Sequence, residues 1–292
     1  WASLMGQGRY AAMPWLGEQL YAAGRIDELG AVARFIAAGQ LGSREGVRCF
    51  SPAITEAPQV PFEIGAGQMW QRRPGADLTL AMDGRELLEY ADIPRIFIGW
   101  PNAVAEGFPN RTTLRGDFPH ETTVRVLIAD VGSERGQASV SLDGQKVADY
   151  AWAKRTEGEK GTPRSMELSL PVGAGRHTLL LENSGQAEWF DLKGIDLGLT
   201  MPALAAIGQR NEQFMALWVW SRPGVFAPTA PATSTGILQL EQVPAGTWRV
   251  TWWDTTKGVP DVPRTIIHSG GTLPLETPGI ARHAAVLLER LR

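Results

Sequence analysis

Residues 122–150 read TTVRVLIADVGSERGQASVSLDGQKVADY, and this stretch decides the fold class. Apolar side chains alternate with other side chains over residues 122–129 and again over 138–142, which is the period of a half-buried strand. The pair Asp143-Gly144 predicts a two-residue hairpin turn, because both central residues of the favoured turn take positive φ. With 145–150 as the return strand, the stretch predicts an antiparallel sheet.

The same texture continues on the C-terminal side of this hairpin. Residues 165–170 and 177–183 alternate around the Pro- and Gly-containing segment 171–175, which predicts a second hairpin. Residues 189–197 predict a further strand, in which either Trp189 or Phe190 faces the core because neighbouring side chains point to opposite faces. Weaker strand patterns lie at 78–81 and 96–100.

The C-terminal ninety residues predict a separate set of strands, at 214–220, 236–240, 244–258 and 284–288. The third of these is the most informative, because its alternation divides six side chains between two faces. One face should carry Trp248, Val250 and Trp252, and the other Arg249, Thr251 and Trp253.

The first 39 residues differ from the rest. The apolar run 10–15 predicts a strand, and from Asp27 the spacing of Leu29, Val32, Phe35 and Ile36 predicts an amphipathic helix that ends at a cap near Gly39. One strand and one helix cannot form a domain alone, so we expect both to bury apolar area against another polypeptide. Residues 39–61 contain Pro52, Pro58 and Pro61 without a clear period and are expected to be a linker.

Composition excludes several classes of function. The 292 residues carry a formal net charge of −3, and Lys and Arg do not cluster, so we expect no nucleic acid and no membrane as a partner. The single Cys49 rules out an intrachain disulfide, and the four histidines do not have metal-site spacing. No signal-peptide pattern opens the sequence.

The N-terminal segment resembles the last strand and helix of the (β/α)8 barrel in secreted retaining glycoside hydrolases of the clan that includes cellulases and mannanases. That family typically has W-W-W-D where this chain has Trp15-Leu16-Gly17-Glu18, so the aromatic wall is thinner here. The matching residues are Trp1, Ser3, Leu4, Met5, Gly6, Gly8, Ala12, Met13, Trp15, Ala33, Phe35 and Ile36.

Four further segments also resemble parts of such enzymes. Residues 140–144, 170–185 and 188–197 are similar to lines of the galactose-binding-like jelly rolls often fused to glycosidases, and 244–258 is similar to a line of the small sandwich that covers barrel helices. The expected fold is therefore mainly β, with two β-sandwiches, a jelly roll and a small Ig-like sandwich, preceded by the last βα unit of a barrel. The expected domains are residues 1–46, 47–200 and 201–292.

The resemblance implies the C-terminal portion of a glycoside hydrolase that acts on β-linked glycans. The two catalytic carboxylates of the clan lie on earlier barrel strands, so no residue of this chain is assigned a catalytic role. Substrate contacts are expected from Trp15 and Glu18 at the barrel cleft and from Trp100 and Trp152 on the jelly roll. For each aromatic residue a packing role remains open; the other candidate aromatics of the jelly roll are Trp70, Phe108 and Phe118.

Two other classes of function remain open: a non-catalytic carbohydrate-binding protein, and a purely structural piece of an assembly. The expected partners are an oligosaccharide or polysaccharide and the N-terminal barrel portion, which could be a separate chain. No cofactor is expected; jelly rolls of this kind often hold a structural calcium ion, for which no ligands can be named here. The family resemblance implies an extracellular or periplasmic location.

Overall fold

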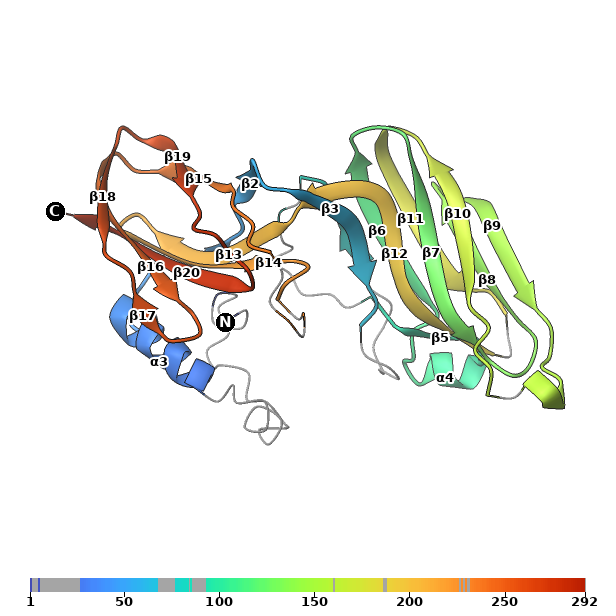
Figure 1. The fold of residues 1–292 in the computed structure, drawn as a ribbon. Coiled ribbons are helices and arrows are strands. Elements are labelled where there is room, and N and C mark those ends of the chain that lie inside the picture. The colour runs from blue at the N-terminus through green and yellow to red at the C-terminus, as the bar shows by residue number, and fades with distance from the viewer. Residues whose placement is uncertain are drawn as a thin grey trace. The chain divides into compact units, whose positions relative to one another are not determined.

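A computed structural model describes residues 1, 5, 27–67, 77–83, 85, 93–159, 161–185, 188–225, 227, 229 and 232–291. The chain divides into two compact units, which are described separately (Figure 1). The terminal unit consists of Trp1–Gln59, Asp83–Leu88 and Pro202–Arg292, and the inserted unit of Val60–Met82 and Glu89–Met201. The inserted unit therefore interrupts the terminal unit in sequence.

The inserted unit is built from two β-sheets. One sheet has the order β10-β7-β12-β3, with β5 also paired to β12, and the other has the order β4-β6-β11-β8-β9. The pairing of β4 with β6 is parallel, whereas β6 and β8 both pair antiparallel with β11. The elements are β3 (Gln59–Gly65), β4 (Asp77–Thr79), β5 (Ile96–Ile98), α4 (Pro101–Ala105), β6 (Arg111–Phe118), β7 (Thr122–Val131), β8 (Gly136–Leu142), β9 (Gln145–Trp152), the 3₁₀ helix η1 (Glu157–Glu159), β10 (Met166–Val172), β11 (Gly175–Asn183) and β12 (Trp189–Pro202).

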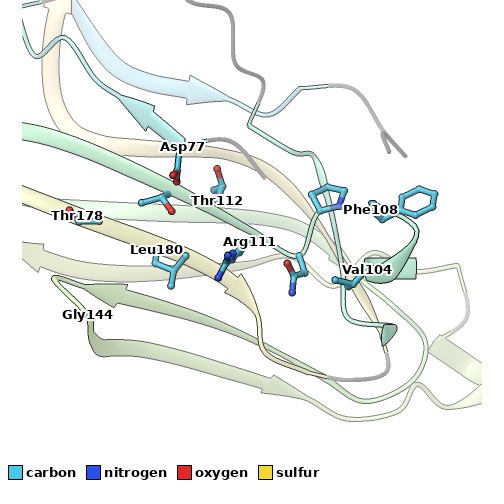
Figure 2. A pocket seen from close by; sticks show the side chains of 12 residues that line it. Asp77, Val104, Phe108, Arg111, Thr112, Gly144, Thr178 and Leu180 are labelled. Atoms are coloured by element: carbon cyan, nitrogen blue, oxygen red, sulfur yellow. The ribbon is translucent and has the colours of Figure 1, made fainter. Parts of the chain in front are cut away.

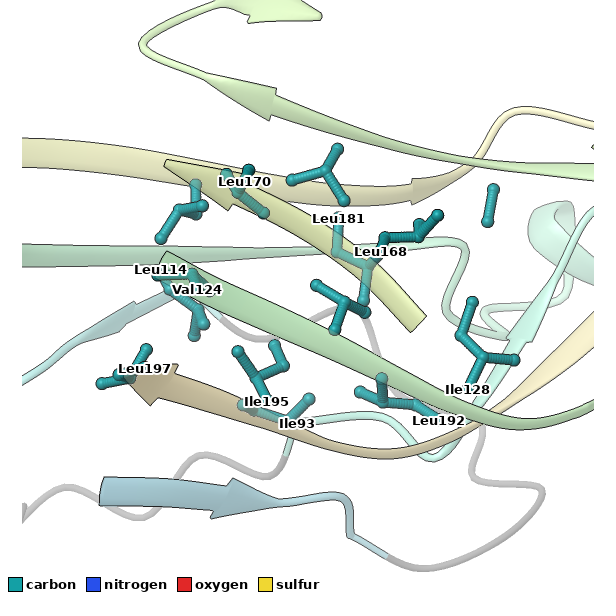
Figure 3. Packing of buried hydrophobic residues seen from close by; sticks show 14 of the residues in the cluster. Ile93, Leu114, Val124, Ile128, Leu168, Leu170, Leu181, Leu192, Ile195 and Leu197 are labelled. Carbon is teal, nitrogen blue, oxygen red and sulfur yellow. The ribbon is translucent and has the colours of Figure 1, made fainter. Parts of the chain in front are cut away.

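The core of this unit lies between the two sheets and is filled by apolar side chains from both of them (Figure 3). Over residues 122–129 of β7 the buried residues are Val124, Val126 and Ile128, so the alternation expected there is confirmed. Phe190 is fully buried and stacks on Phe97 with ring centroids 4.6 Å apart, whereas Trp189 is only partly buried. The core residue of that neighbouring pair is therefore Phe190.

The hairpin expected at Asp143-Gly144 joins β8 to β9. The two residues have φ values of 51° and 81°, as the tight turn requires, and Leu142 pairs with Gln145 across it. The Asp143 carboxylate also accepts a hydrogen bond from the backbone N–H of Thr178 at 2.8 Å. The turn is thus tied to the adjacent strand β11.

The second expected hairpin does not exist. β10 pairs with β7 in one sheet, while β11 pairs with β6 and β8 in the other, so residues 171–175 carry the chain from one sheet to the other. Gly175, with φ of 109°, begins β11 in a conformation that favours glycine. Alternation fixes which face of a strand is buried but does not identify its neighbour, and both strands here bury their apolar faces in the shared core.

The terminal unit is also a two-sheet sandwich, with a helix against one sheet. The larger sheet has the order β1-β13-β14-β20-β16-β17, with β18 also paired to β16, and the smaller sheet is β19-β15-β2. The elements are α3 (Asp27–Gly39), β1 (Arg48–Phe50), β2 (Ala53–Thr55), β13 (Leu204–Asn211), β14 (Phe214–Ser221), β15 (Ile237–Val243), β16 (Gly246–Asp254), β17 (Val259–Pro260), β18 (Arg264–His268), β19 (Gly271–Glu276) and β20 (His283–Leu291).

Strand β16 has the two faces expected from its sequence. Trp248, Val250 and Trp252 belong to the core between the two sheets. Trp253 lies on the opposite face of the sheet, in the apolar cluster that includes Phe35 of α3. The alternation of this strand therefore places its aromatic side chains in two different layers.

The segment expected to be a linker contains two strands of the terminal unit. β1 pairs with β13, with Cys49 opposite Gln209, and β2 pairs with β15. Residues 47–59, which we expected at the start of the jelly roll, therefore belong to the terminal sandwich, and the inserted unit begins at Val60. Strands of three residues are too short for a period to be visible in the sequence.

Helix α3 lies against the outer face of the larger sheet, and its buried residues are Ala31, Val32, Phe35 and Gly39. The Phe35 ring meets the rings of Trp1 and Trp253 edge-on, with centroids 5.2 and 5.5 Å apart. The chain's own sheet therefore covers Phe35, whereas Leu29 of the same apolar face is 43% exposed and Ile36 is only partly buried. That another polypeptide covers part of this helix stays a prediction. The strand expected at residues 10–15 lies outside the described residues, so no barrel unit is seen.

The end of α3 differs by one residue from the expected cap. Gly39 is the last helical residue, and Gln40, with φ of 51°, takes the left-handed conformation that ends the helix. The N–H of Leu41 then donates to the carbonyl of Ile36 at 3.1 Å. A Cβ on Gly39 would approach Leu287 of the sheet to 3.1 Å, so this glycine serves close packing.

Among the described residues, no helix is long and apolar enough to cross a lipid bilayer.

Candidate functional site

Two of the four predicted substrate-binding residues, Trp15 and Glu18, lie outside the described residues, as does the further candidate Trp70. Trp100 directly precedes helix α4 and is 38% exposed. Its carbonyl accepts the backbone N–H of Val104 at 3.0 Å, which begins the helix. Trp100 is thus at the surface of the inserted unit.

Trp152 is a core residue. It is 3% exposed and ends β9 directly opposite Gly136 of β8. A Cβ on Gly136 would lie 2.2 Å from the Cζ2 atom of the indole ring, so the ring fills the space that the glycine leaves. Its burial at this position is that of a packing residue, which is the alternative that the sequence left open for it.

The remaining aromatic candidates also separate into core and surface. Phe118 is 2% exposed and belongs to the core, with its ring centroid 6.0 Å from that of His177. Phe108 instead lines a cavity of about 630 Å³ in the inserted unit. This cavity is called the sheet-face cavity below.

Strands β4, β6 and β11, the segment after α4 and the β8–β9 turn form the sheet-face cavity (Figure 2). Figure 2 shows Val104 and Phe108 at one end, near α4, and Asp77 and Thr178 towards the other. The lining residues are Asp77, Val104, Gly107, Phe108, Pro109, Asn110, Arg111, Thr112, Thr113, Gly144, Thr178 and Leu180.

Strand register aligns three of these residues in a row. Thr113 of β6 pairs with Asp77 of β4 on one side and with Leu180 of β11 on the other. The next residue pair, Leu114 and Leu179, is buried in the core, so Thr113 and Leu180 belong to the face turned away from it. One row across three strands therefore presents a carboxylate, a hydroxyl and an aliphatic side chain.

The segment after α4 holds Phe108 at the cavity. Gly107 has φ of 92°, and the N–H of Phe108 donates to the carbonyl of Ala103 at 3.1 Å, which ends the short helix in a left-handed turn. The carbonyl of Pro109 then accepts the N–H of Ile98 at 2.9 Å, and that of Asn110 accepts the N–H of Asn183 at 2.8 Å. These bonds fix the segment to β5 and β11, so the wall is preformed.

The charged groups of the cavity are Asp77 and Arg111. A hydrogen bond from Thr113 is the main cause that lowers the pKa of Asp77, with further contributions from the charges of Arg115 and Arg111. The Asp77 carboxylate also lies 3.4 Å from the Arg115 guanidinium. Asp77 is therefore ionised at neutral pH and acts as a hydrogen-bond acceptor.

The arrangement supplies an apolar wall and several hydrogen-bonding groups, which suits recognition of a neutral polar molecule. Phe108 was among the candidates found in the sequence, whereas Asp77, Arg111, Thr113 and Thr178 were not. The usable signal was the alternation in 111–118, which places Arg111 and Thr113 on one face. The pairing of β6 with β4 and β11 could not be inferred from it.

Metal chemistry finds no support in the described part of the chain, where no three His, Cys, Asp or Glu side chains come together in a way that could hold an ion. The described residues therefore give no candidate ligands for the structural calcium ion that jelly rolls of the resembled kind often hold. Cys49 is partly buried, and its thiol lies 3.3 Å from the carbonyl of Met5.

Comparison with known proteins gives only distant matches. No family model matches this sequence, and no curated protein matches it. Among solved structures, a cycloisomaltooligosaccharide glucanotransferase from Paenibacillus sp. is 7% identical with a TM-score of 0.24, and the match covers 82% of this chain and 45% of that one. Latent PorU from Porphyromonas gingivalis is 13% identical with a TM-score of 0.33, over 82% of this chain and 21% of that one.

A xanthan lyase from Paenibacillus is 13% identical with a TM-score of 0.22, and the match covers 62% of this chain and 23% of that enzyme. The chain thus spans less than half of each of these proteins. TM-scores this low do not indicate a shared overall arrangement. Two of these three distant neighbours are named as carbohydrate-active enzymes. The chain itself is mainly β.

Proposed function

We propose that the sheet-face cavity binds a neutral glycan segment. Its volume of about 630 Å³ lies within the roughly 300–1,000 Å³ usual for ligand sites. A pyranose ring has an apolar face, which Phe108 and Leu180 can cover, and hydroxyl groups at its edge, which Asp77, Arg111 and Thr113 can bind. One carboxylate and one guanidinium leave the lining without a net charge, which favours a neutral ligand.

We propose further that the chain works as the C-terminal portion of a glycoside hydrolase that acts on β-linked glycans, with its catalytic carboxylates on residues outside this sequence. The resemblance of residues 1–39 and 244–258 to such enzymes supports this. So does the position of α3 on the terminal sandwich, because a sandwich that covers barrel helices is what the resemblance implies. Trp15 and Glu18 would then contribute to the substrate cleft, and Trp100 to the surface beside the glycan.

The observation that carries the proposal is the combination of Phe108 with the Asp77, Thr113 and Leu180 row in one preformed cavity. Titration calorimetry with soluble β-linked glucans and mannans tests it. Phe108→Ala should weaken binding about twofold to tenfold, because an aromatic contact of this kind contributes about 0.5–1.5 kcal/mol. Tyr150→Ala is the matched control, since Tyr150 is 38% exposed on β9 and outside the cavity lining.

A non-catalytic carbohydrate-binding protein is the second candidate function. One observation favours it: the largest apolar side chain of helix α3, Phe35, is fully buried against the chain's own sheet. Glycan binding by the chain alone, with no hydrolysis when any barrel portion is supplied, would select this candidate. If no tested glycan binds and Phe108→Ala changes nothing, the cavity does not have the function proposed for it.

A further inference from the structure

Two arginines face each other across the first strand pair of the terminal sandwich. Arg48 of β1 is directly opposite Arg210 of β13 in the antiparallel register. Like charges in directly opposed positions destabilise a strand pair. Other arginines of this unit pair with carboxylates: Arg44 and Arg249 both contact Glu289, at 3.1 and 2.6 Å.

Among the described residues, neutral oxygens accept the hydrogen bonds of this arginine pair, and the Glu241 carboxylate acts on Arg210 only through its charge. The two guanidinium groups share the amide oxygen of Gln242, at 3.2 Å from Arg48 and 3.4 Å from Arg210. Arg210 also donates to the backbone carbonyl of Glu241, and its guanidinium lies 4.8 Å from the centroid of the Phe50 ring. The nearby Glu241 carboxylate is engaged with Arg85 at 2.8 Å.

A β-bulge brings Gln242 to this position. The pairing of β15 with β19 shifts register between Leu240 and Val243, and Gln242 has φ of 54°. A residue that is not glycine takes this conformation at some cost, and bulges commonly re-aim side chains beside functional sites. The irregular backbone thus places one hydrogen-bond acceptor between the two cations.

The arginines line a cavity of about 460 Å³. Its wall includes Met215, which is 1% exposed, and the polar side chains of Gln242 and Glu212. The two guanidinium groups and the one Glu212 carboxylate leave the lining with a net positive charge. Burial, followed by the charge of Arg48, lowers the pKa of Arg210, and the opposing charge of Glu241 offsets this only in part.

We propose that this cavity binds an oxyanion between Arg48 and Arg210, either the carboxylate of an acidic sugar or a phosphate group. Guanidinium forks match both groups in bidentate geometry, and hydrogen bonds between ionised partners are about twice as strong as neutral ones. The bound anion would relieve the repulsion between the arginines. This site is independent of the sheet-face cavity and of the glycan bound there.

The test follows the side-chain Nε–Hε NMR signals of the arginines in the full chain during titration with sodium glucuronate or sodium phosphate at constant ionic strength. We expect saturable shifts of the Arg48 and Arg210 signals, assigned by their loss in Arg48→Gln and Arg210→Gln. The double variant should weaken binding at least tenfold. The two titrations distinguish a carboxylate from a phosphate ligand.

Arg176→Gln controls for the loss of one positive charge, because the Arg176 side chain is 91% exposed in the other unit. Gln242→Glu places a carboxylate between the two cations, so it should abolish anion binding and raise the melting temperature. Gln145→Glu, at an exposed position of β9, controls for the added negative charge. Absence of saturable shifts in the native chain, or unchanged affinity in Gln242→Glu, would overturn the proposal.

Discussion

At the scale of single residues, the contact between Gly136 and Trp152 shows how a core aromatic can be mistaken for a binding residue. An indole side chain at the end of a strand has the same sequence appearance whether it faces a sugar or the core. Here the opposing position is a glycine, and the ring occupies the space above it. A matched pair of a large and a small residue across two strands is a packing solution.

Gly136→Ala should destabilise the inserted unit by about 1–3 kcal/mol. The new methyl group would lie 2.2 Å from the Trp152 ring, so the ring or the backbone of β8 would have to shift. Urea unfolding followed by tryptophan fluorescence measures the change. Gly158→Ala is the control, since a Cβ there meets no atom within 4 Å. Equal stability of Gly136→Ala and the native chain would show that the ring can move away from β8.

At the scale of elements, the sequence was reliable wherever one strand or helix carried a long pattern. The faces of β7 and β16, the turn at Asp143-Gly144 and the extent of α3 follow from periodicity and turn chemistry. Pairing did not follow, because a two-residue period is the same for a hairpin and for two strands in facing sheets. The hairpin expected between β10 and β11 failed for this reason.

The same limit explains why the sequence showed only part of the candidate site. Phe108 could be singled out as an aromatic in a loop, but Asp77, Thr113 and Leu180 are distant in sequence and meet only through the register of β4, β6 and β11. In the terminal unit, the pairing of Arg48 with Arg210 depends on a three-residue strand. Sites built across strands are therefore visible only once the sheet order is known.

Phe35→Ala tests whether α3 is an integral layer of the terminal unit. The side chain is fully buried between Trp1 and Trp253, and removing a buried aromatic costs about 3–5 kcal/mol. We expect the terminal unit to unfold at correspondingly lower urea concentration. Leu29→Ala, at a helix position that is 43% exposed, should change its stability much less. A helix held only by another polypeptide would give two variants of equal stability.

At the scale of the whole chain, the polypeptide leaves the terminal unit for the inserted unit and returns to it at neighbouring positions. The N–H of Ala203 donates to the carbonyl of Pro58 at 2.7 Å, so the two ends of the insertion are in contact. β1 and β2 lie before the insertion and pair with β13 and β15, which lie after it. The terminal sandwich is thus assembled from strands that lie before and after the inserted unit in the sequence.

This arrangement predicts that residues 60–201 can be replaced by a short Gly-Ser linker without unfolding the terminal unit. The deletion removes Arg85, whose partly exposed ion pair with Glu241 contributes about 0–1 kcal/mol. Shortening the connection costs no closure entropy, since that cost rises with loop length. The unfolding free energy of the remaining unit should therefore stay within about 1 kcal/mol of its value in the full chain, as measured by urea denaturation.

The informative comparison is a deletion of residues 47–200, which follows the domain boundaries expected from the sequence. It would also remove β1 and β2, including Ile54, which is 7% exposed in the sandwich core. The smaller sheet would then lose one of its three strands, and the larger sheet an edge strand. We expect this shorter chain to be unstable or aggregated where the 60–201 deletion is folded. Equal stability of the two would mean that β1 and β2 contribute nothing to the sandwich.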